Sequence, residues 1–485
     1  MLFPIWDYRY IRIITTSPDT TLSEIGFKKS GEDRLLPVSV YEDIDAEKYP
    51  ASLVIDEQDS IVLHPTYQDE SYFDEVYHPR NAWEIANGQY MYASVHPLLG
   101  TSLIALSIKI FGMHPLAWRI PGALFGVLLV PLLYAVLKVI FVKPEYAALG
   151  TLLFSADFMH ITTSRIATLE PFSVFFILLM YYYMLRYYYT NFYDTSWRVQ
   201  RRLLLCSGIA MGLGIATKWT ACYSAVGLAV LFFTNLYLQY RQTRIARSML
   251  KTDLPEDHDE VCEDMIRVFS QRTLRTILWC VLVFVILPVV IYFASYIPCK
   301  VWRDGYSIPN VISQIKYIYN YHIDLDATHP YQSTWWQWIL DIRPIWYYDG
   351  VNLTPSRTIA CFSNPIVCWA GFFTVILTIY KCVRNRDGDA FVILVGYLSA
   401  IMPWVLVQRC VFAYHFYPTS FFMIMGIVYA VRVLIQRNDK WRKYTWILAG
   451  ISVLVFILFL PVLTGFGTTP GYIKFLEWLP SWYFG

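Results

Sequence analysis

The sequence predicts an all-α polytopic membrane protein. Three observations lead to this fold class: 56% of the 485 residues are hydrophobic, 16% are charged, and the mean hydropathy is +0.40. Soluble globular domains carry about 25% charged residues and fewer apolar ones. Beyond Leu98 the apolar residues form long runs separated by short polar connections, which is the pattern of membrane-spanning helices.

Ten apolar segments predict about ten transmembrane helices, because each is close to the length that crosses a bilayer. The segments are 117–137, 147–163, 169–189, 203–217, 220–238, 277–297, 359–380, 389–407, 413–434 and 445–465. Leu98 to Phe111 is apolar but too short to span, so we expect an amphipathic helix that lies in the membrane interface.

The first 95 residues are polar and hold no apolar run of ~18 residues. Within them, 6–13, 23–27 and 36–41 are β-branched or aromatic runs between turn residues, which predicts short strands. The runs RYIRI and SEIGF resemble the closing strands of a discoidin-like β-sandwich. We therefore expect residues 1–60 to be a small, partial β-rich segment whose beginning precedes Met1.

The distribution of basic residues predicts the orientation of the chain. Loops after the first, third, fifth, seventh and ninth segments carry about twice as many Lys and Arg as the opposite loops, which places them in the cytoplasm. The outer face then holds the 61–116 loop, the aromatic-rich 298–358 loop and the 466–485 tail, with helices one to six in 117–297 and seven to ten in 359–465. The five tryptophans of the 298–358 loop favour interfacial anchoring, with a sugar-stacking platform as the alternative.

Charge and cysteine content exclude other classes of function. A net charge of +2, with basic residues distributed by topology, argues against a nucleic-acid partner. The nine cysteines are scattered and lack zinc-site spacing. The acidic run 253–264 lacks the ligand spacing and the glycine of a calcium loop, so we interpret it as a solvated loop.

Candidate functional residues gather at the outer ends of the apolar segments, where charged groups are costly enough to suggest function. The set comprises Asp74, Glu75, His78, Arg80, His96, Arg119, Arg165, Glu170, Lys218, Arg343, Arg409 and His415. Snorkelling of single cations would distribute them over both faces of the membrane. A carboxylate among cations suits transfer of a group away from a phosphate, since the base takes a proton from the attacking hydroxyl and the cations stabilise the leaving phosphate.

Eight motifs in collinear order resemble the protein O-mannosyltransferase family of GT-C glycosyltransferases. They are YFDEVYH (72–78), SVHPLLGTSLIAL (94–106), AWRIPGALFG (117–126), TSRIATLEPF (163–172), GLGIATKW (212–219), HPYQSTWWQWILDIRPIWYY (329–348), SNPIVCW (363–369) and YHFYP (414–418). Each motif alone is weak, whereas eight in order, from about residue 70 to 465, make a specific resemblance.

The resemblance implies a function and roles for individual residues. It implies an inverting transfer of mannose, or a related hexose, from polyprenyl-phosphate-mannose to Ser/Thr hydroxyls of exported proteins, at the extracytoplasmic face of the plasma membrane. Asp74 falls on the family's catalytic base and Glu75 on the second acid of the pair. Arg165, Lys218 and Arg409 fall in motifs assigned to the donor, with His96 and His415 as further donor-site candidates. We expect no cofactor, no metal site and no requirement for a divalent cation, because the cations of the chain can stabilise the phosphate.

The chain also departs from the family pattern. It reads HPLLGT where HPPLGK is usual, so Leu98 and Thr101 replace a proline and a lysine. The 298–358 loop is too short for the β-trefoil domain of eukaryotic members, which favours a bacterial-type enzyme. The family usually has eleven membrane helices, so we expect a first helix upstream of Met1.

Three other functions stay open at this point. A related GT-C enzyme would glycosylate a lipid or a cell-wall polymer with the same donor chemistry. A membrane transporter would show two halves with matching broken helices, and no such symmetry is visible. A non-catalytic carbohydrate-binding protein would not need Asp74.

Overall fold

A computed structural model describes the chain except residues 1–8, 15–23, 30–31, 43–49, 93 and 252–255, and the side chains of 256–258. The chain forms two compact units, Met1–Glu70 and Ser71–Gly485. The division falls after Glu70, later than the predicted boundary at residue 60.

The described part of Met1–Glu70 contains little regular structure. It has two short 3₁₀ helices, η1 (Ala51–Val54) and η2 (Gln58–Ser60), and an isolated antiparallel bridge between Lys28 and Leu35. The prediction of strands at 9–13, 24–27 and 36–41 is therefore wrong for these described residues; 6–8 and 23 lie outside them. A few β-branched residues between turns do not suffice to form a sheet, because short strands are stable only when they pair with other strands and share an apolar face with them.

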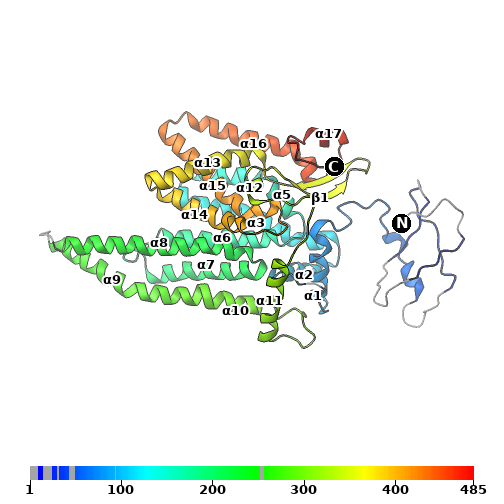
Figure 1. Ribbon diagram of the computed structural model, residues 1–485, viewed down its shortest axis with the longest axis horizontal. Coiled ribbons are helices and arrows are strands. Elements are labelled where there is room, and N and C mark those ends of the chain that lie inside the picture. Colours follow the sequence, from blue (N-terminus) through cyan, green and yellow to red (C-terminus); the bar gives the residue numbers. More distant parts are fainter. Residues whose placement is uncertain (1–8, 15–23, 30–31, 43–49, 93, 252–255) are drawn as a thin grey trace. The chain divides into compact units, whose positions relative to one another are not determined.

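The unit Ser71–Gly485 is a helical bundle with one β-hairpin (Figure 1). Its helices are η3 (Phe73–Val76), α1 (His78–Ala86), α2 (Leu99–Phe111), α3 (Pro115–Phe141), α4 (Pro144–Ser155), α5 (Phe158–Ser164), α6 (Glu170–Tyr188), α7 (Trp197–Thr217), α8 (Thr220–Met249), α9 (Glu256–Val281), η4 (Leu282–Ile286, a π-helical turn), α10 (Leu287–Ala294), α11 (Ile308–Ile323), α12 (Trp335–Ile339), α13 (Pro365–Asn385), α14 (Gly388–Ile401), η5 (Met402–Val405), η6 (Ala413–Phe416), α15 (Tyr417–Arg437), α16 (Trp441–Thr464) and α17 (Pro470–Phe475). The strands are β1 (Ile345–Gly350) and β2 (Arg357–Cys361).

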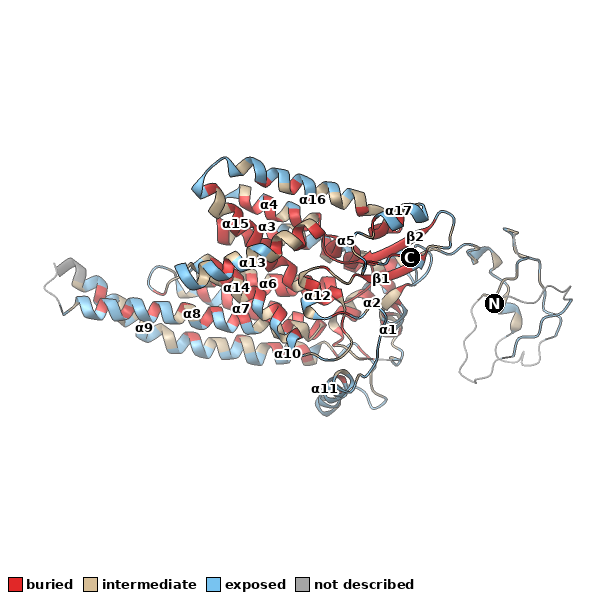
Figure 2. Cartoon of the chain, turned by 45° about the horizontal axis from the view of Figure 1, so that its top comes forward, coloured by how far each residue is buried: buried red, intermediate tan, exposed pale blue. Residues whose placement is uncertain are grey.

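Among the described residues, eight helical segments are long and apolar enough to cross a membrane. They confirm a multi-pass helical protein, but not the predicted count of ten. The α4–α5 region is broken, and the tyrosines of α6 lower its hydropathy. The spans differ in burial: the most apolar window of the α15 span is 78% buried, whereas that of the α9–α10 span is 17% buried. Figure 2 shows the same contrast, with α15 and α6 inside the bundle and α9 and α16 on its surface.

The predicted segment 147–163 is two helices, because Asp157 interrupts it. The Asp157 side chain accepts the N–H of His160, as the N-cap of α5, and the N–H of Asn364 at 2.9 Å. Aspartate favours helix N-caps because its side chain satisfies backbone N–H groups that the helix leaves free. The break lets the chain turn before the 163–172 motif.

The predicted helix 359–380 is also wrong at its start, since 359–361 belong to β2, and the helix begins at Pro365 after the N-cap Asn364. β2 pairs with β1 in an antiparallel hairpin, with Trp346 opposite Ala360. Buried strands read as continuous apolar runs and cannot be told from a buried helix by periodicity. The hairpin occupies the end of the predicted 298–358 loop and the start of the predicted helix.

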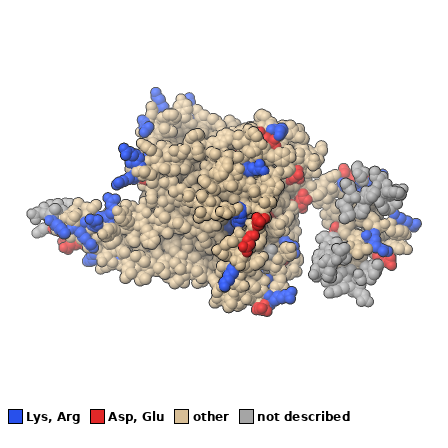
Figure 3. All heavy atoms as spheres, viewed as in Figure 1, with Lys and Arg blue, Asp and Glu red and all other residues tan. Residues whose placement is uncertain are grey.

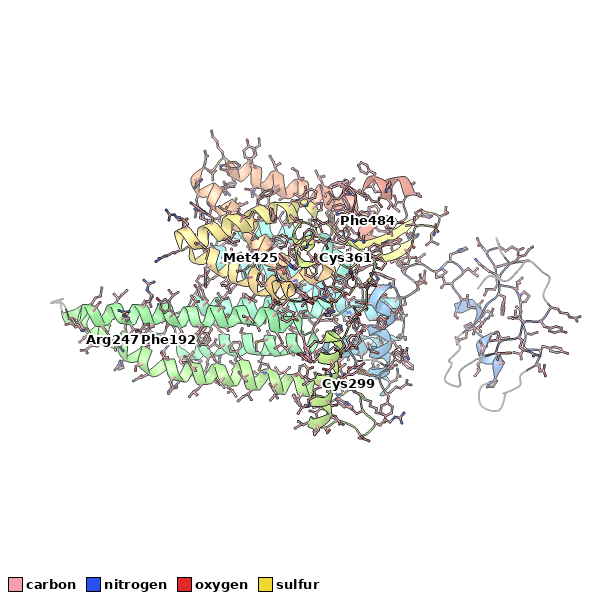
Figure 4. All side chains as sticks on the ribbon, in the orientation of Figure 1. Phe192, Arg247, Cys299, Cys361, Met425 and Phe484 are labelled. Carbon is pink, nitrogen blue, oxygen red and sulfur yellow. The ribbon has the colours of Figure 1, made fainter. Side chains whose placement is uncertain are left out.

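The bundle has two chemically different ends. α7 runs from Trp197 to Thr217 and α8 returns from Thr220, so Lys218 lies at one end and the α8–α9 connection at the other. Figure 4 shows Phe192 and Arg247 at that second end, far from Cys299 and Cys361. Lys and Arg cluster on the tips of α8 and α9, and the visible surface between the two ends is largely uncharged (Figure 3). This pattern is typical of a bilayer-embedded body with basic residues at one face.

Candidate active site

The acidic pair lies on the short helix η3, which begins with Phe73 and is followed by α1. Phe73 has a φ of +53°, which is unusual for a bulky non-glycine residue and costs free energy. Its ring stacks on Tyr347 of β1 at 4.3 Å between centroids and lies edge-on to Tyr414 at 6.0 Å. The β-hairpin therefore holds the turn that presents Asp74 and Glu75.

Glu75 is fully occupied by protein partners. Arg119 of α3 donates from Nε to Oε1 at 2.8 Å and from Nη2 to Oε2 at 2.6 Å, and the N–H of Ala167 donates to Oε1 at 2.9 Å. The Glu75 side chain has no exposed surface. A bidentate, charge-assisted pair of this kind is strong and geometrically specific. It ties η3 to α3 and to the 163–172 motif, so Glu75 is placed to position the pair rather than to exchange protons.

Asp74 has the opposite environment. In the described part of the chain, its carboxylate accepts no hydrogen bond and forms no ion pair within 4.0 Å. Burial and then the negative charge of Glu170 raise the pKa of Asp74 to about 7, against the opposing effect of Lys218. A carboxyl that titrates near neutral pH and has free lone pairs is suited to general base catalysis.

Lys218 and Glu170 form an ion pair beside Asp74. Glu170 begins α6 and Lys218 ends α7, and both side chains are largely buried. The ammonium also lies 5.4 Å from the centroid of the Tyr414 ring. Because an ammonium has three donor hydrogens, the pair with Glu170 leaves donors for an anionic ligand.

Arg409 lies in the same electrostatic neighbourhood without an acidic partner among the described residues. Its guanidinium donates from Nη1 to the carbonyl of the adjacent residue Cys410, at 3.3 Å. The positive charge of Arg409 acts to lower the pKa of His96, His322 and Tyr414. Lys218 acts to lower the pKa of His96 and His322 as well. A half-buried guanidinium with no carboxylate nearby is a candidate ligand for a phosphate.

Three histidines form a chain of rings next to these cations. His96 lies 6.3 Å from His78 and 5.3 Å from His322, between ring centroids. Burial, together with the positive charge of Lys218, lowers the pKa of His78 to about 4; burial, then Arg409 and Lys218, lowers that of His322 to about 4. Burial and the same cations lower the pKa of His96 well below its usual value. At neutral pH the three rings are therefore uncharged hydrogen-bonding groups.

His322 of α11 is a site residue that the sequence reasoning missed. Its Nε2 lies 3.1 Å from the carbonyl oxygen of Val95 and so carries the proton, which makes Nδ1 an acceptor. Nδ1 is buried and has no partner among the described protein atoms. A buried acceptor without a partner is costly unless a ligand or water fills it. The sequence places His322 in the predicted outer 298–358 loop, but a single histidine in a long loop is too weak a signal to mark a site residue.

His415 and Arg165 have protein partners of their own. The His415 ring stacks on Trp338 at 5.9 Å, meets Trp404 edge-on at 4.3 Å, and accepts the N–H of Phe412. Arg165 donates to the carbonyl of Leu463 at 3.2 Å. Their predicted role in binding the donor stays a prediction.

The remaining predicted polar groups are distributed around the site. Arg80 pairs with Glu84 on α1 and lies over the Tyr92 ring at 3.9 Å. Arg343 donates to the carbonyl of Pro330.

Trp338 and Trp346 pack within the protein, where their indole N–H groups donate to Ser333 and Thr358. Within the described residues, no group of three His, Cys, Asp or Glu side chains could hold a metal ion.

Two family profiles match consecutive parts of the chain. The profile of dolichyl-phosphate-mannose-protein mannosyltransferases matches residues 115–298, and the profile of the C-terminal four-helix membrane region of protein O-mannosyltransferases matches residues 308–482. The chain belongs to the protein O-mannosyltransferase family. The family predicted from the motifs is thereby confirmed.

Bacterial relatives and a solved structure agree with this family assignment. The polyprenol-phosphate-mannose–protein mannosyltransferase of Mycolicibacterium smegmatis is 25% identical, over 86% of this chain and 89% of its own. That of Mycobacterium tuberculosis is 23% identical, over 84% and 86%. The Saccharomyces cerevisiae protein O-mannosyltransferase Pmt1-Pmt2 complex, solved with its sugar donor, shares the fold with a TM-score of 0.69 at 14% identity, over 86% of this chain and 90% of that one.

Proposed function

We propose that this O-mannosyltransferase transfers mannose from a polyprenyl-phosphate donor to a Ser or Thr hydroxyl of an exported protein, with Asp74 as the base. The observation that carries the proposal is the contrast within the acidic pair: Glu75 accepts three hydrogen bonds, whereas the Asp74 carboxylate accepts none from the described residues and lies within the electrostatic influence of Lys218. The names of the mycobacterial relatives support this donor and this class of acceptor.

The residues suggest a division of labour in the reaction. Asp74 takes the proton of the acceptor hydroxyl as its oxygen attacks the anomeric carbon of mannose. The bond between that carbon and the phosphate oxygen breaks, and polyprenyl phosphate leaves with the electron pair. Attack on the face opposite the phosphate inverts the anomeric centre, from a β-linked donor to an α-linked product. The developing positive charge on the sugar resembles the transition state of glycoside hydrolysis.

In this proposal Lys218 and Arg409 bind the phosphate of the donor. Charge builds on the phosphate as the sugar departs, and fixed cations in a partly buried site stabilise it. Glu170 holds the Lys218 ammonium in place and keeps the net charge of the site low before the donor binds. The neutral rings of His96 and His322 are suited to hydrogen bonds with sugar hydroxyls, because an uncharged imidazole both donates and accepts.

Transfer of labelled mannose tests the proposal directly. Purified chain in detergent receives polyprenyl-phosphate-[³H]mannose and a peptide rich in Ser and Thr. We expect label on the peptide that mild alkali releases by β-elimination and that α-mannosidase removes. Label that instead enters lipid or polysaccharide, with none on the peptide, would favour the related GT-C enzyme with another acceptor.

The location of the site outside the cytoplasm is part of the proposal. It rests on the excess of Lys and Arg in the loops at the opposite end of the bundle. In intact cells, a membrane-impermeant maleimide should label Asp304→Cys, in the loop after α10, above the background of the native cysteines. Asn438→Cys, in the loop between α15 and α16, should react only after the cells are opened. The reverse pattern would place the site in the cytoplasm.

A further inference from the structure

A pocket lies between α7 and α9, at the end of the bundle remote from Lys218. Its volume is about 520 Å³, and it is lined by Trp197, Arg201, Gln271, Leu274, Arg275, Leu278 and Trp279. Lys218 follows Arg201 by seventeen positions, almost all of them in α7, which corresponds to roughly 25 Å along a helix axis. The pocket is therefore most of a bilayer core away from the candidate active site, in the opposite leaflet.

Fixed contacts hold the two walls together. The indole N–H of Trp279 donates to the carbonyl of Arg201 at 3.0 Å. About two turns of α9 away, Arg272 donates from Nη1 to the carbonyl of Thr195 at 2.7 Å. The positions 197 and 201 lie on one face of α7, and 271, 274, 275 and 278 lie on one face of α9, because residues three or four apart share a helix face. The pocket is thus a built feature of two packed helices.

The charge of the pocket is positive and uncompensated. Arg201 and Arg275 are exposed, and within the described residues neither guanidinium forms a hydrogen bond or an ion pair. The lining contains no Asp or Glu. Arg198 and Arg202 add further exposed positive charge at the start of α7. Guanidinium groups bind phosphate through paired N–H donors, so the ligand that complements this lining is an anion.

The floor of the pocket is apolar and continues along the helix. Leu274 is 65% exposed and Leu278 is 61% exposed, and Leu282, one turn further, is also exposed. These residues are spaced four apart and form a stripe that leads from the arginines toward the centre of the membrane. The two tryptophans lie at the arginine end, as aromatic residues do at the level of lipid headgroups. A ligand that fits has an anionic head and an apolar tail.

From this arrangement we infer that the pocket between α7 and α9 binds an anionic phospholipid, with the phosphate at Arg201 and Arg275 and an acyl chain along Leu274, Leu278 and Leu282. Basic pockets between membrane helices are known to hold acidic headgroups. The inference does not depend on the proposed transfer reaction.

Thermal unfolding of the full chain in a neutral detergent tests the site. Added phosphatidylglycerol should raise Tm by several degrees, because a ligand that binds the folded state stabilises it by mass action. Phosphatidylcholine and soluble glycerol phosphate should leave Tm unchanged. The double variant Arg201→Gln/Arg275→Gln should lose most of the shift. The matched control Arg244→Gln/Arg247→Gln removes the same charge from the exposed end of α8 and should keep it.

Two results would overturn the lipid assignment. One is an equal shift with glycerol phosphate, which would make the pocket a site for free phosphate compounds. The other is an undiminished phosphatidylglycerol shift in the pocket variant. If that variant does not fold, native mass spectrometry of the unsubstituted chain in an equimolar mixture of phosphatidylglycerol and phosphatidylcholine decides the question. We expect about tenfold more phosphatidylglycerol to be retained, and equal retention would refute the inference.

Discussion

Glu75 and Arg119 form a bidentate ion pair that fixes the acidic turn to α3, with N–O distances of 2.8 and 2.6 Å. The two adjacent carboxylates therefore have different roles. Glu75 accepts hydrogen bonds from Arg119 and Ala167, whereas no described residue donates one to the Asp74 carboxylate. The pair lets a strained turn, with Phe73 at positive φ, stay in one conformation.

Removing one partner of that pair should destabilise the protein strongly. Glu75→Ala leaves the Arg119 charge largely buried and without its carboxylate, which costs about 3–5 kcal/mol. We expect a large fall in Tm, measured in detergent. The double variant Glu75→Gln/Arg119→Met should be less destabilised than the sum of its single variants, since no uncompensated charge is left. Strict additivity would contradict a direct ion pair.

The activity should depend on pH through Asp74. Burial and Glu170 raise the pKa of Asp74 to about 7, and the base is active when deprotonated. We therefore expect kcat/KM to rise with pH and to level off above about 7. His78 and His322, whose pKa values are lowered to about 4, should add no step between pH 5.5 and 8.5. A rate that is constant from pH 5.5 to 8.5 would show that the base titrates elsewhere.

The raised pKa of Asp74 also predicts a pH-dependent stability. A folded-state pKa above the unfolded value stabilises the protein below about pH 4, and that stabilisation is lost as pH rises through about 7. Asp74→Asn removes this dependence. The unfolding free energy of Asp74→Asn minus that of the unsubstituted chain should therefore increase from pH 4 to pH 7.5 by about 4 kcal/mol, and the difference in Tm should increase with it. A difference that stays constant across this range would contradict the buried environment of Asp74.

The two candidate phosphate ligands should behave differently when their charge is removed. Arg409 has no described acidic partner, so Arg409→Gln should raise KM for the donor at least tenfold with little change in Tm. Lys218→Met should lower Tm as well, because it leaves Glu170 buried and unpaired. Equal loss of Tm in both variants would mean that Arg409 has a structural role. The peptide KM in the same assay provides the control, since neither residue is assigned to the acceptor.

Chelation should leave the activity intact. Lys218 and Arg409 provide the positive charge that a divalent cation would otherwise supply to the phosphate. We expect transfer at the full rate in excess EDTA after the protein has been dialysed against chelator. Loss of transfer that added magnesium or manganese restores would show that the acidic pair recruits a metal.

Much of the fold followed from the length and order of apolar runs, but the interruptions did not. Asp157 breaks one predicted helix by capping the next, and β2 occupies the start of another. Both breaks depend on partners distant in sequence: Asn364 for Asp157, and Trp346 and its neighbours for β2. The periodicity of apolar residues within one segment carries no information about such distant partners.

The residues of the candidate site that lie in sequence motifs could be predicted. The contacts that give these residues their roles could not, because the fold creates them. Asp74, Lys218 and Arg409 were named from the sequence, and the structure brings them into one neighbourhood with His96. The division of roles between Asp74 and Glu75 needed the position of Arg119, and the orphaned Nδ1 of His322 needed the contact of its other nitrogen with Val95. These are tertiary contacts between distant segments, so no pattern within one segment predicts them.

The base assignment is tested most directly by comparing Asp74→Asn with the unsubstituted chain in two measurements, donor binding and single-turnover transfer. Asparagine keeps the size of the side chain but cannot take a proton. We predict that Asp74→Asn binds polyprenyl-phosphate-mannose with a Kd within about threefold of the unsubstituted value, and that its transfer rate falls by at least ~100-fold, as expected for loss of a general base. A transfer rate within tenfold of the unsubstituted chain would contradict the assignment of Asp74 as the base.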